Sequence, residues 1–309
     1  MPGSIHITIV NWNTGPYLGD CLASIAAADA PGVTLARVTV VDNASSDGSA
    51  RGLGERGLPL EVIANDRNVG FAAACNQGAA GTTADYLLFL NPDTRLFEDS
   101  LARVTSFMDG EQSDGIGICG AEMVDGAGRG GISCARFPTL RVMFGKMTGL
   151  HRVMPRLFPG HHLTAAETQR SRFVDQVIGA FFFVRRDLFE QLGGFDTQYF
   201  LYFEEVDFAR RALLHGARSY FLKQARVLHA ENVSSDQVRD ARLYHSLRSR
   251  RLYAYKHWTR RQAQALDVLT LSVELTARLT SAALRRSGSD LVAIGSGYRR
   301  FLADLVRHA

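Results

Sequence analysis

Ile5-His6-Ile7-Thr8-Ile9-Val10, followed by Asn11-Trp12-Asn13, is the stretch of sequence that decides the fold class. Its first six residues are mostly apolar and β-branched, which is typical of a buried strand. After the polar loop, the apolar residues are spaced three and four apart, as on one face of a helix. That face consists of Leu18, Cys21, Leu22 and Ile25. The N-terminus is therefore predicted to form a strand, a loop and a helix.

The same order of elements repeats along the first third of the chain. Strand-like runs occur at residues 37–41, 60–64 and 86–90. Residues 42–47 contain helix-capping side chains and predict a helix beginning nearby, and residues 71–80 have helical character. Such alternation predicts parallel strands joined by right-handed crossovers. We therefore expect an α/β fold, a mixed but mostly parallel sheet flanked by helices.

The second half of the chain is less regular. Residues 115–131 are rich in glycine and predict a hairpin, whereas residues 137–162 are basic and aromatic and predict a mobile excursion. We expect strands at residues 174–184 and 219–228, and helices at residues 187–192 and 204–215. From about residue 236 onward the sequence has helical character, which predicts a C-terminal helical appendage.

The charge of the chain is unevenly distributed. The 309 residues are 46% hydrophobic, which is ample for a core, and their formal net charge is only +4. From Asp240 to the C-terminus, thirteen Arg or Lys face five Asp or Glu, a net charge of +8 that leaves −4 upstream. This polarity predicts a catalytic body with a basic tail facing a membrane surface, a lipid diphosphate or a nucleic acid. No nucleic-acid motif accompanies the tail, so nucleic-acid binding is not expected.

The cysteines and the apolar runs indicate the compartment. The four cysteines have no metal-ligand or redox spacing, so we expect reduced structural thiols. They are Cys21, Cys75, Cys119 and Cys134. The first apolar run is too short for a signal peptide, and no run reaches the roughly 18 residues of a membrane span. The chain is therefore expected to be cytoplasmic, not to cross a membrane, and to be able to lie on one.

Polar side chains follow two of the predicted strands. Asp42 either caps a helix or, with Trp12 stacking on the base, accepts hydrogen bonds from a nucleobase or ribose. Asn91-Pro92-Asp93 is either a turn or presents Asp93 to a divalent cation that neutralises a departing diphosphate. Because α/β sheets bind ligands at the carboxyl ends of their strands, we favour a nucleotide and metal site.

A third acidic cluster opens the helix predicted at residues 204–215. Glu204, Glu205 and Asp207 could serve only to stabilise the helix dipole. The aromatic run at residues 199–203 favours a desolvated carboxylate with a raised pKa, suited to a general base. His229 ends a strand, where it either packs and hydrogen-bonds or supplies a second metal ligand.

Taken in order, these motifs resemble the family-2 glycosyltransferases, nucleotide-sugar-dependent enzymes with a glycosyltransferase-A fold. The match runs through most of the first 235 residues. Its main elements are Val10-Asn11-Trp12-Asn13, Val41-Asp42-Asn43, Asn68-Val69-Gly70-Phe71, Asn76, Leu90-Asn91-Pro92-Asp93-Thr94, Gly179-Ala180, Gly193-Gly194-Phe195-Asp196, Glu204-Glu205-Val206-Asp207 and Arg211.

The resemblance implies a role for each matched residue. Asp93 would bind Mg or Mn, and His229 would be the second metal contact. Glu205 falls at the position of the catalytic base, with Asp207 and Glu204 as the other candidates. Asn91 stands where many relatives carry the first Asp of an Asp-x-Asp motif. The donor pocket would be lined by Trp12, Asn13, Asp42, Asn68, Gly70, Asn91 and Asp93.

The resemblance also implies a reaction and a division of the chain. In a single in-line displacement, Glu205 would take the proton of the acceptor hydroxyl, and the anomeric configuration of the sugar would invert. The catalytic domain would span residues 1–235, with a nucleotide-sugar-binding half at 1–110 and an acceptor-binding half at 111–235. Residues 236–309 would form the basic helical region.

The Asn-Pro-Asp motif and the Arg-rich C-terminal helices most resemble the rhamnosyltransferase-like branch. That branch transfers L-rhamnose from dTDP-L-rhamnose to saccharide or polyprenyl-diphosphate-linked acceptors of surface polysaccharides such as O-antigen. Residues 137–162 and the basic tail would then contact the inner face of the cytoplasmic membrane, or else form a solvated face or a homo-oligomer contact. The other hypotheses are a UDP-sugar-dependent transferase (galactosyl, glucosyl or N-acetylhexosaminyl) and a non-catalytic sugar-nucleotide-binding protein.

Overall fold

A computed structural model describes residues 2–28, 33–54, 57–229 and 239–307. The chain divides into two compact units. The first unit comprises Met1–Arg136, His162–Gln198 and Glu204–Ser234, and the second comprises Phe137–His161, Tyr199–Phe203 and Ser235–Ala309. The boundary predicted at residues 235 and 236 lies outside the described residues.

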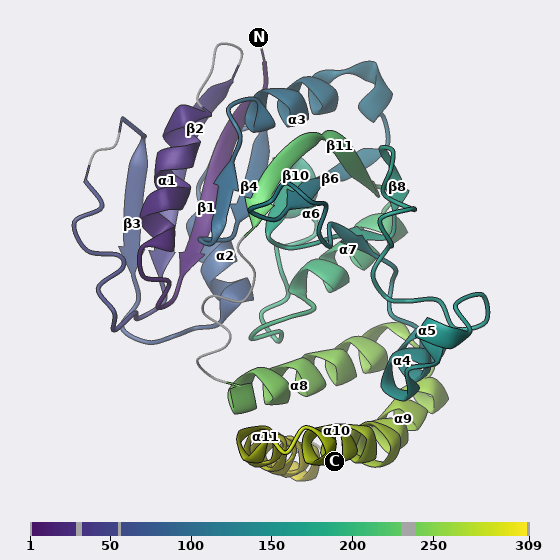
Figure 1. Cartoon of the computed structure of the whole chain (residues 1–309). Helices are drawn as coiled ribbons and strands as arrows, with labels where there is room; N and C mark the ends of the chain where they lie inside the picture. Colours follow the sequence, from purple (N-terminus) through teal and green to yellow (C-terminus); the bar gives the residue numbers. More distant parts are fainter. Residues whose placement is uncertain (1, 29–32, 55–56, 230–238, 308–309) are drawn as a thin grey trace. The chain divides into compact units, whose positions relative to one another are not determined.

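The described part of the first unit contains a nine-stranded sheet with the order β3-β2-β1-β4-β10-β6-β11-β5, in which β8 pairs with β11 (Figure 1). The pairs β1–β2, β2–β3, β1–β4 and β6–β11 are parallel, whereas β10 is antiparallel to both of its neighbours. This is the expected mixed, mostly parallel sheet. The strands are β1 (Ser4–Asn11), β2 (Thr34–Asp42), β3 (Leu60–Ala64), β4 (Tyr86–Leu90), β5 (Thr94–Leu96), β6 (Ile116–Val124), β8 (Arg172–Val174), β10 (Phe181–Arg185) and β11 (Arg218–His229).

Helices of the first unit cover this sheet with their apolar faces. The predicted face of α1 (Tyr17–Ala27) is fully buried in the main core, together with Ile5, Ile7 and Ile9 of β1. In α2 (Phe71–Ala79), a Cβ atom on Gly78 would collide with the side chains of Thr8 and Val41. The glycine therefore lets α2 approach the sheet closely. The other elements are α3 (Ser100–Asp109), a 3-10 turn (Glu111–Ser113), α6 (Arg186–Gln191), α7 (Glu204–Leu214) and the small sheet of β7 (Cys134–Ala135) with β9 (Gln176–Val177).

The prediction of a glycine-rich hairpin at residues 115–131 was wrong for its first half, because residues 116–124 form β6, an inner strand of the sheet. A Cβ atom on Gly117 would collide with Leu188, and one on Gly120 would lie 2.5 Å from Cβ of Val177. These glycines permit close packing rather than a turn.

Three other expectations also differ from the structure. The described residues between β2 and β3 form turns and no helix, and the strand predicted at residues 174–184 is split among β8, β9 and β10. The predicted excursion at residues 137–162 contains α4 (Leu140–Thr148) and α5 (Leu150–Val153). Elsewhere the residues expected to be helical or extended are so, including the C-terminal helices.

The second unit is helical and has two small cores. Val142 and Met143 of α4 pack with Ala254, Ala263 and Leu266, and a second cluster is centred on Tyr298 and Phe301. None of the described helices is long and apolar enough to cross a membrane. Besides α4 and α5, the elements are α8 (Arg239–His257), α9 (Arg260–Leu269), a π-helical turn (Thr270–Glu274), α10 (Leu275–Leu284) and α11 (Gly288–Arg307).

Candidate active site

The carboxyl ends of β1 and β2 are joined by a side-chain network. Asn11 and Asp42 are register partners in the parallel ladder, so both leave the sheet at the same edge. The side-chain nitrogen of Asn11 lies 2.8 Å from Oδ1 of Asp42, 3.0 Å from Oγ of Ser45 and 2.9 Å from Oγ of Ser49. The hydroxyl of Ser45 also donates to Asp42 at 2.5 Å. The half-buried Asp42 carboxylate is therefore fixed in place by two different donors.

The loop after β1 is tied to the loop after β2 through Asn13. This residue adopts a left-handed conformation with φ of 51°, and its amide oxygen accepts a hydrogen bond from the backbone N–H of Ser46 at 2.8 Å. Its own backbone N–H donates to Oγ of Ser45 at 3.0 Å. Trp12 is half-buried in the same loop. The structure thus brings together Trp12, Asn13 and Asp42, the first three residues predicted for the donor pocket.

Asn43 connects this edge to the loop that precedes α2. Its side chain donates to Oδ1 of Asn68 at 3.0 Å and accepts from the backbone N–H of Val69 at 3.1 Å. Oδ1 of Asn68 also accepts the N–H of Gly70 at 2.9 Å, and Gly70, with φ of 90°, is the residue before α2. The position of the predicted Asn68 and Gly70 loop therefore depends on Asn43, a residue of the Val41-Asp42-Asn43 motif for which no role was predicted. Its place beside Asp42 at a strand end was the available signal.

Asp93 and His229 lie together at the same sheet edge. The two residues flank the pairing of β5 with β11, in which His229 is the register partner of Thr94. Nε2 of His229 is 3.4 Å from Oδ1 of Asp93, and their side chains are 15% and 11% exposed. Asn91 donates its backbone N–H to Ala180 at 3.0 Å and accepts the Thr94 hydroxyl at 2.6 Å, which fixes the turn leading to Asp93. Within the described residues, no group of three or more His, Cys, Asp or Glu forms a metal site.

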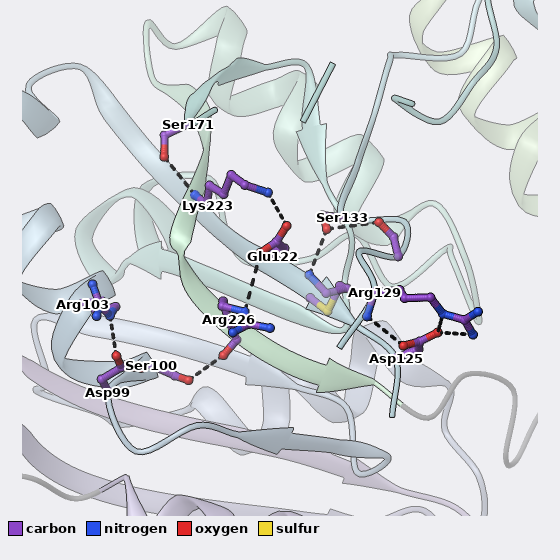
Figure 2. Close-up of polar contacts among 12 residues, drawn as sticks. Asp99, Ser100, Arg103, Glu122, Asp125, Arg129, Ser133, Ser171, Lys223 and Arg226 are labelled. Atoms are coloured by element: carbon purple, nitrogen blue, oxygen red, sulfur yellow. Dashed lines mark hydrogen bonds and ion pairs between the residues drawn. The ribbon is translucent and has the colours of Figure 1, made fainter. Parts of the chain in front are cut away.

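Polar contacts of Lys223 and Arg226 attach β11 to the neighbouring elements (Figure 2). The same strand ends at His229, next to β5. The register between β11 and β6 shifts between Leu222 and Arg226. Side-chain contacts fix the residues at this irregularity. Lys223 donates to Glu122 and Arg226 lies 3.7 Å from the same carboxylate, while the Ser100 hydroxyl donates to the Arg226 carbonyl at 2.6 Å. The irregular strand is thereby fastened to β6 and to α3.

Glu204 and Glu205 occupy different surroundings at the start of α7. Glu204 is 5% exposed, and burial, followed by the charge of Glu205, raises its pKa well above the ordinary value. Glu205 is half-buried, and a Cβ atom on Gly179 would lie 3.6 Å from its Cγ, so the Gly179 backbone lines this side chain. The pKa of the buried Cys75 thiol is also raised, by burial and then by the charges of Glu204 and Glu205. Burial therefore favours the protonated form of Glu204.

Asp207 forms a buried ion pair with Arg211. Its side chain is 0% exposed and accepts a hydrogen bond from Nε of Arg211 at 2.7 Å. The Arg211 guanidinium also donates to the carbonyls of Leu192 and Gly194 at 2.7 and 2.8 Å. The Gly193-Gly194 turn that closes α6 is therefore fixed to α7 by this ion pair.

All four cysteines are buried free thiols, in agreement with the structural role predicted for them. Cys21 lies beneath the Asn91 turn, with its sulfur 3.7 Å from the Asn91 carbonyl. Burial raises its pKa to about 12. A free thiol with this pKa stays protonated at neutral pH, which suits a packing role.

A sequence profile described as Glycosyl transferase family 2 matches residues 4–193, which contain the whole edge formed by β1, β2 and β4. The chain belongs to this family. It is therefore a glycosyltransferase, and the mixed sheet with its flanking helices is the glycosyltransferase-A fold.

Two characterised relatives are rhamnosyltransferases. The chain is 28% identical over 246 residues to the N-acetylglucosaminyl-diphospho-decaprenol L-rhamnosyltransferase of Mycobacterium tuberculosis, covering 74% of this chain and 76% of that protein. It is 25% identical over 146 residues to the rhamnosyltransferase WbbL of Escherichia coli strain K12, covering 47% of this chain and 52% of that protein. The chain is thus a rhamnosyltransferase-like member of the family.

Solved structures with low sequence identity share the fold. The mannosyltransferase from Pyrobaculum calidifontis in complex with GDP-Man and Mn²⁺ has a TM-score of 0.57 at 17% identity, over 98% of this chain and 88% of that one. Staphylococcus aureus TarS in complex with UDP-GlcNAc has a TM-score of 0.55 at 18% identity, over 94% of this chain and 78% of that one. These likenesses support the fold assignment alone.

Proposed function

We propose that the protein is an inverting rhamnosyltransferase that moves L-rhamnose from dTDP-L-rhamnose to a saccharide or polyprenyl-diphosphate-linked saccharide during cell-surface polysaccharide synthesis. The observation that supports it most is the 3.4 Å approach of His229 to Asp93 at the edge where Asp42 also ends its strand. The rhamnosyltransferases of M. tuberculosis and E. coli favour rhamnose as the sugar and, for the former, a lipid-diphosphate acceptor.

The donor nucleotide would bind at the loops after β1 and β2. Trp12 would stack on the base, and the Asp42 carboxylate, held by Asn11 and Ser45, would accept hydrogen bonds from the base or ribose. Asn68 and Gly70 would line the same pocket, since Asn43 ties their loop to the end of β2.

Asp93 and His229 would hold Mg or Mn. Carboxylate oxygen and imidazole nitrogen suit a divalent cation whose remaining ligands come from the donor diphosphate and water. The cation would supply positive charge to the departing nucleoside diphosphate. The Asn91 turn and the pairing of β5 with β11 keep the two side chains within reach of one ion.

We assign the general base to Glu205. Burial raises the pKa of Glu204, whereas Glu205 is half-buried and lies beside the Gly179 backbone, so Glu205 would be the carboxylate that an acceptor hydroxyl reaches. Glu205 would accept the proton of the acceptor hydroxyl as that oxygen bonds to the anomeric carbon and the bond from this carbon to the diphosphate oxygen breaks. Asp207, whose carboxylate is occupied by Arg211, would fix α7 rather than take the proton.

The acceptor would be reached at the inner face of the cytoplasmic membrane. In the second unit, Val153, Met154 and Leu157 are 74%, 47% and 50% exposed and alternate with Arg152 and Arg156. Exposed apolar side chains interspersed with arginine suit the interface of an anionic membrane. This contact would be peripheral.

Calorimetric binding of dTDP, UDP and GDP, with and without Mn²⁺, tests the donor site. We expect dTDP to bind tightest and only with the metal, and Asp93→Ala to abolish this binding. Asp99→Ala is the matched control, because Asp99 is exposed and pairs with Arg103. Tighter binding of UDP would indicate that the donor carries a sugar other than rhamnose. If no nucleotide bound in the presence of metal, a transferase site at Asp93 would be excluded.

A further inference from the structure

Two arginines of the second unit pair with a single buried carboxylate, Glu274, in the π-helical turn against which α4, the helix of Lys146, packs. Arg250 of α8 donates to Oε2 of Glu274 at 2.5 Å, and Arg278 of α10 donates to Oε1 at 2.7 and 3.0 Å. The charge of Lys146 in α4 adjoins both arginines: burial, and then the charges of Arg250 and Arg278, lower the pKa of its ammonium group. Glu274 is the one carboxylate in this set, so the cluster has a net charge of +2.

Neighbouring acidic residues do not neutralise this net positive charge. Each of the other acidic residues on α8 to α11 has an arginine of its own. The pairs are Asp267 with Arg251, Asp304 with Arg248, Asp240 with Arg300, and Asp290 with Arg239. A concentration of like charge at a partly desolvated site is unfavourable unless an anion is present.

One donor of the cluster is buried without an acceptor. The guanidinium of Arg250 is 11% exposed and also donates to Oγ1 of Thr270 at 2.9 Å, but its Nε–H has no partner. A buried N–H that lacks an acceptor lowers the stability of the folded protein. Thr270 and Glu274 are the two ends of a π-helical turn, a distortion that is frequent at functional sites.

We propose that Lys146, Arg250 and Arg278 form a binding site for a phosphate or diphosphate group. Such a group carries about two negative charges and several acceptor oxygens, which match the net charge of the cluster and the free Nε–H. Lys146 keeps an exposed surface although its ammonium group is crowded by protein atoms, and Arg278 is 41% exposed, so a ligand reaches the cluster from solvent. Both arginines keep one edge of the guanidinium on Glu274, which fixes their orientation for the anion.

The phosphate can belong to a membrane lipid or to a soluble molecule. Val153, Met154 and Leu157 are exposed a few residues beyond Lys146 in the same segment, which suits an anion that is attached to a lipid. If the proposed function is right, the anion is the diphosphate of the acceptor, and only that assignment rests on the proposed function. Phosphate binding by the cluster does not depend on it.

Titration calorimetry of sodium pyrophosphate into the full chain, with EDTA to disable the metal-dependent donor site, tests the proposal. Lys146→Ala breaks none of the ion pairs described above, and we expect it to weaken binding about tenfold, the effect of one charge-assisted hydrogen bond. Lys146→Ala with Arg278→Ala should abolish binding. The control, Arg261→Ala with Arg299→Ala, removes the same charge from exposed positions and should change affinity less than about twofold.

Co-flotation with phosphatidylcholine vesicles, with and without phosphatidic acid, identifies the source of the phosphate. If the protein binds phosphatidic acid vesicles through Lys146 but does not bind pyrophosphate, the ligand is a lipid. If it binds both the vesicles and pyrophosphate through Lys146, the site also accepts soluble phosphate. Binding of neither ligand, or equal losses in the control variant, overturns the proposal. Binding of dTDP with Mn²⁺, measured on the same samples, reports the donor site separately, so failure of one proposal is distinguishable from failure of the other.

Discussion

Glu204 and Glu205 are adjacent in sequence, and their different burial determines what each can do. Glu205→Gln removes the proposed proton acceptor while keeping the size of the side chain. We expect the turnover rate for rhamnosyl transfer to fall by about 10²- to 10⁴-fold, with dTDP binding unchanged. Glu190→Gln is the control, since Glu190 is exposed and pairs with Arg186. If Glu205→Gln kept full activity and a folded Asp207→Asn variant lost activity, the general base would be Asp207.

The raised pKa of Glu204 makes stability depend on pH. The unfolded chain loses this proton near the ordinary pKa of 4.5, whereas the folded protein retains it. Folding therefore becomes less favourable as the pH rises from about 4.5 to the folded pKa, by at most about 1.4 kcal/mol per pH unit. Glu204→Gln should match the wild type in urea unfolding at pH 4.5 and be more stable at pH 8. An equal difference at both pH values would show that Glu204 is not protonated in the folded protein.

The sequence predicted the charged residues of the site better than the residues that hold them. Asp42, Asp93 and His229 were selected because they end strands, and the structure places them at one edge of the sheet. No role was predicted for Asn11 and Asn43, because their partners lie more than twenty residues away and depend on strand register. The catalytic and metal-binding roles themselves stay predictions.

At the scale of elements, the turn between α6 and α7 is fixed from two sides. Asn76 of α2 exchanges two hydrogen bonds with the backbone of Phe195, at 2.8 and 2.9 Å, and Arg211 holds the Gly194 carbonyl. Gly194 has a φ of 75°, and a Cβ atom there would lie 2.7 Å from Oδ1 of Asn76. Close packing and backbone conformation thus both require glycine at this position.

Alanine substitutions at two neighbouring glycines distinguish the cost of backbone conformation from the cost of close packing. Gly193→Ala should destabilise the protein by about 1–2 kcal/mol, because its φ is 72° but nothing lies within 4 Å of the added methyl group. Gly194→Ala should lower the free energy of unfolding by about 1–3 kcal/mol more than Gly193→Ala, because Asn76 must break its hydrogen bonds. Urea unfolding of both variants measures the difference. Equal midpoints would mean that Asn76 moves aside freely.

Elements were predicted well where the sequence pattern was local and poorly where packing overrode it. The strands at residues 60–64 and 86–90 have the predicted bounds, because polar loops flank short apolar runs. β6 was missed because its glycines resemble turn residues, whereas their function is to admit Leu188 and Val177. The helices at residues 140–153 were missed because the residues that cover Val142 and Met143 lie a hundred positions further along the chain.

At the scale of the whole molecule, the basic C-terminal part predicts adhesion to anionic membranes. We expect the protein to float with vesicles that contain phosphatidylglycerol, not with pure phosphatidylcholine, and to dissociate at about 0.5 M salt, where charges are strongly screened. Val153→Asp with Leu157→Asp should reduce the bound fraction. Val62→Asp with Leu214→Asp adds the same charge at exposed sites of the first unit and should leave it unchanged. Equal binding by both double variants would contradict a contact through residues 153–157.

The network around Asn11 has a consequence for ligand entry. The Asp42 carboxylate accepts hydrogen bonds from the amide of Asn11 and from the hydroxyl and backbone N–H of Ser45, whereas an ionised carboxylate has about four acceptor sites. A sugar hydroxyl can therefore donate to Asp42 without displacing an existing partner. Calorimetry of nucleoside binding should therefore show a favourable enthalpy, and a purely entropic signature would contradict it. The ligand then adds a hydrogen bond at Asp42, and the network around Asn11 stays intact.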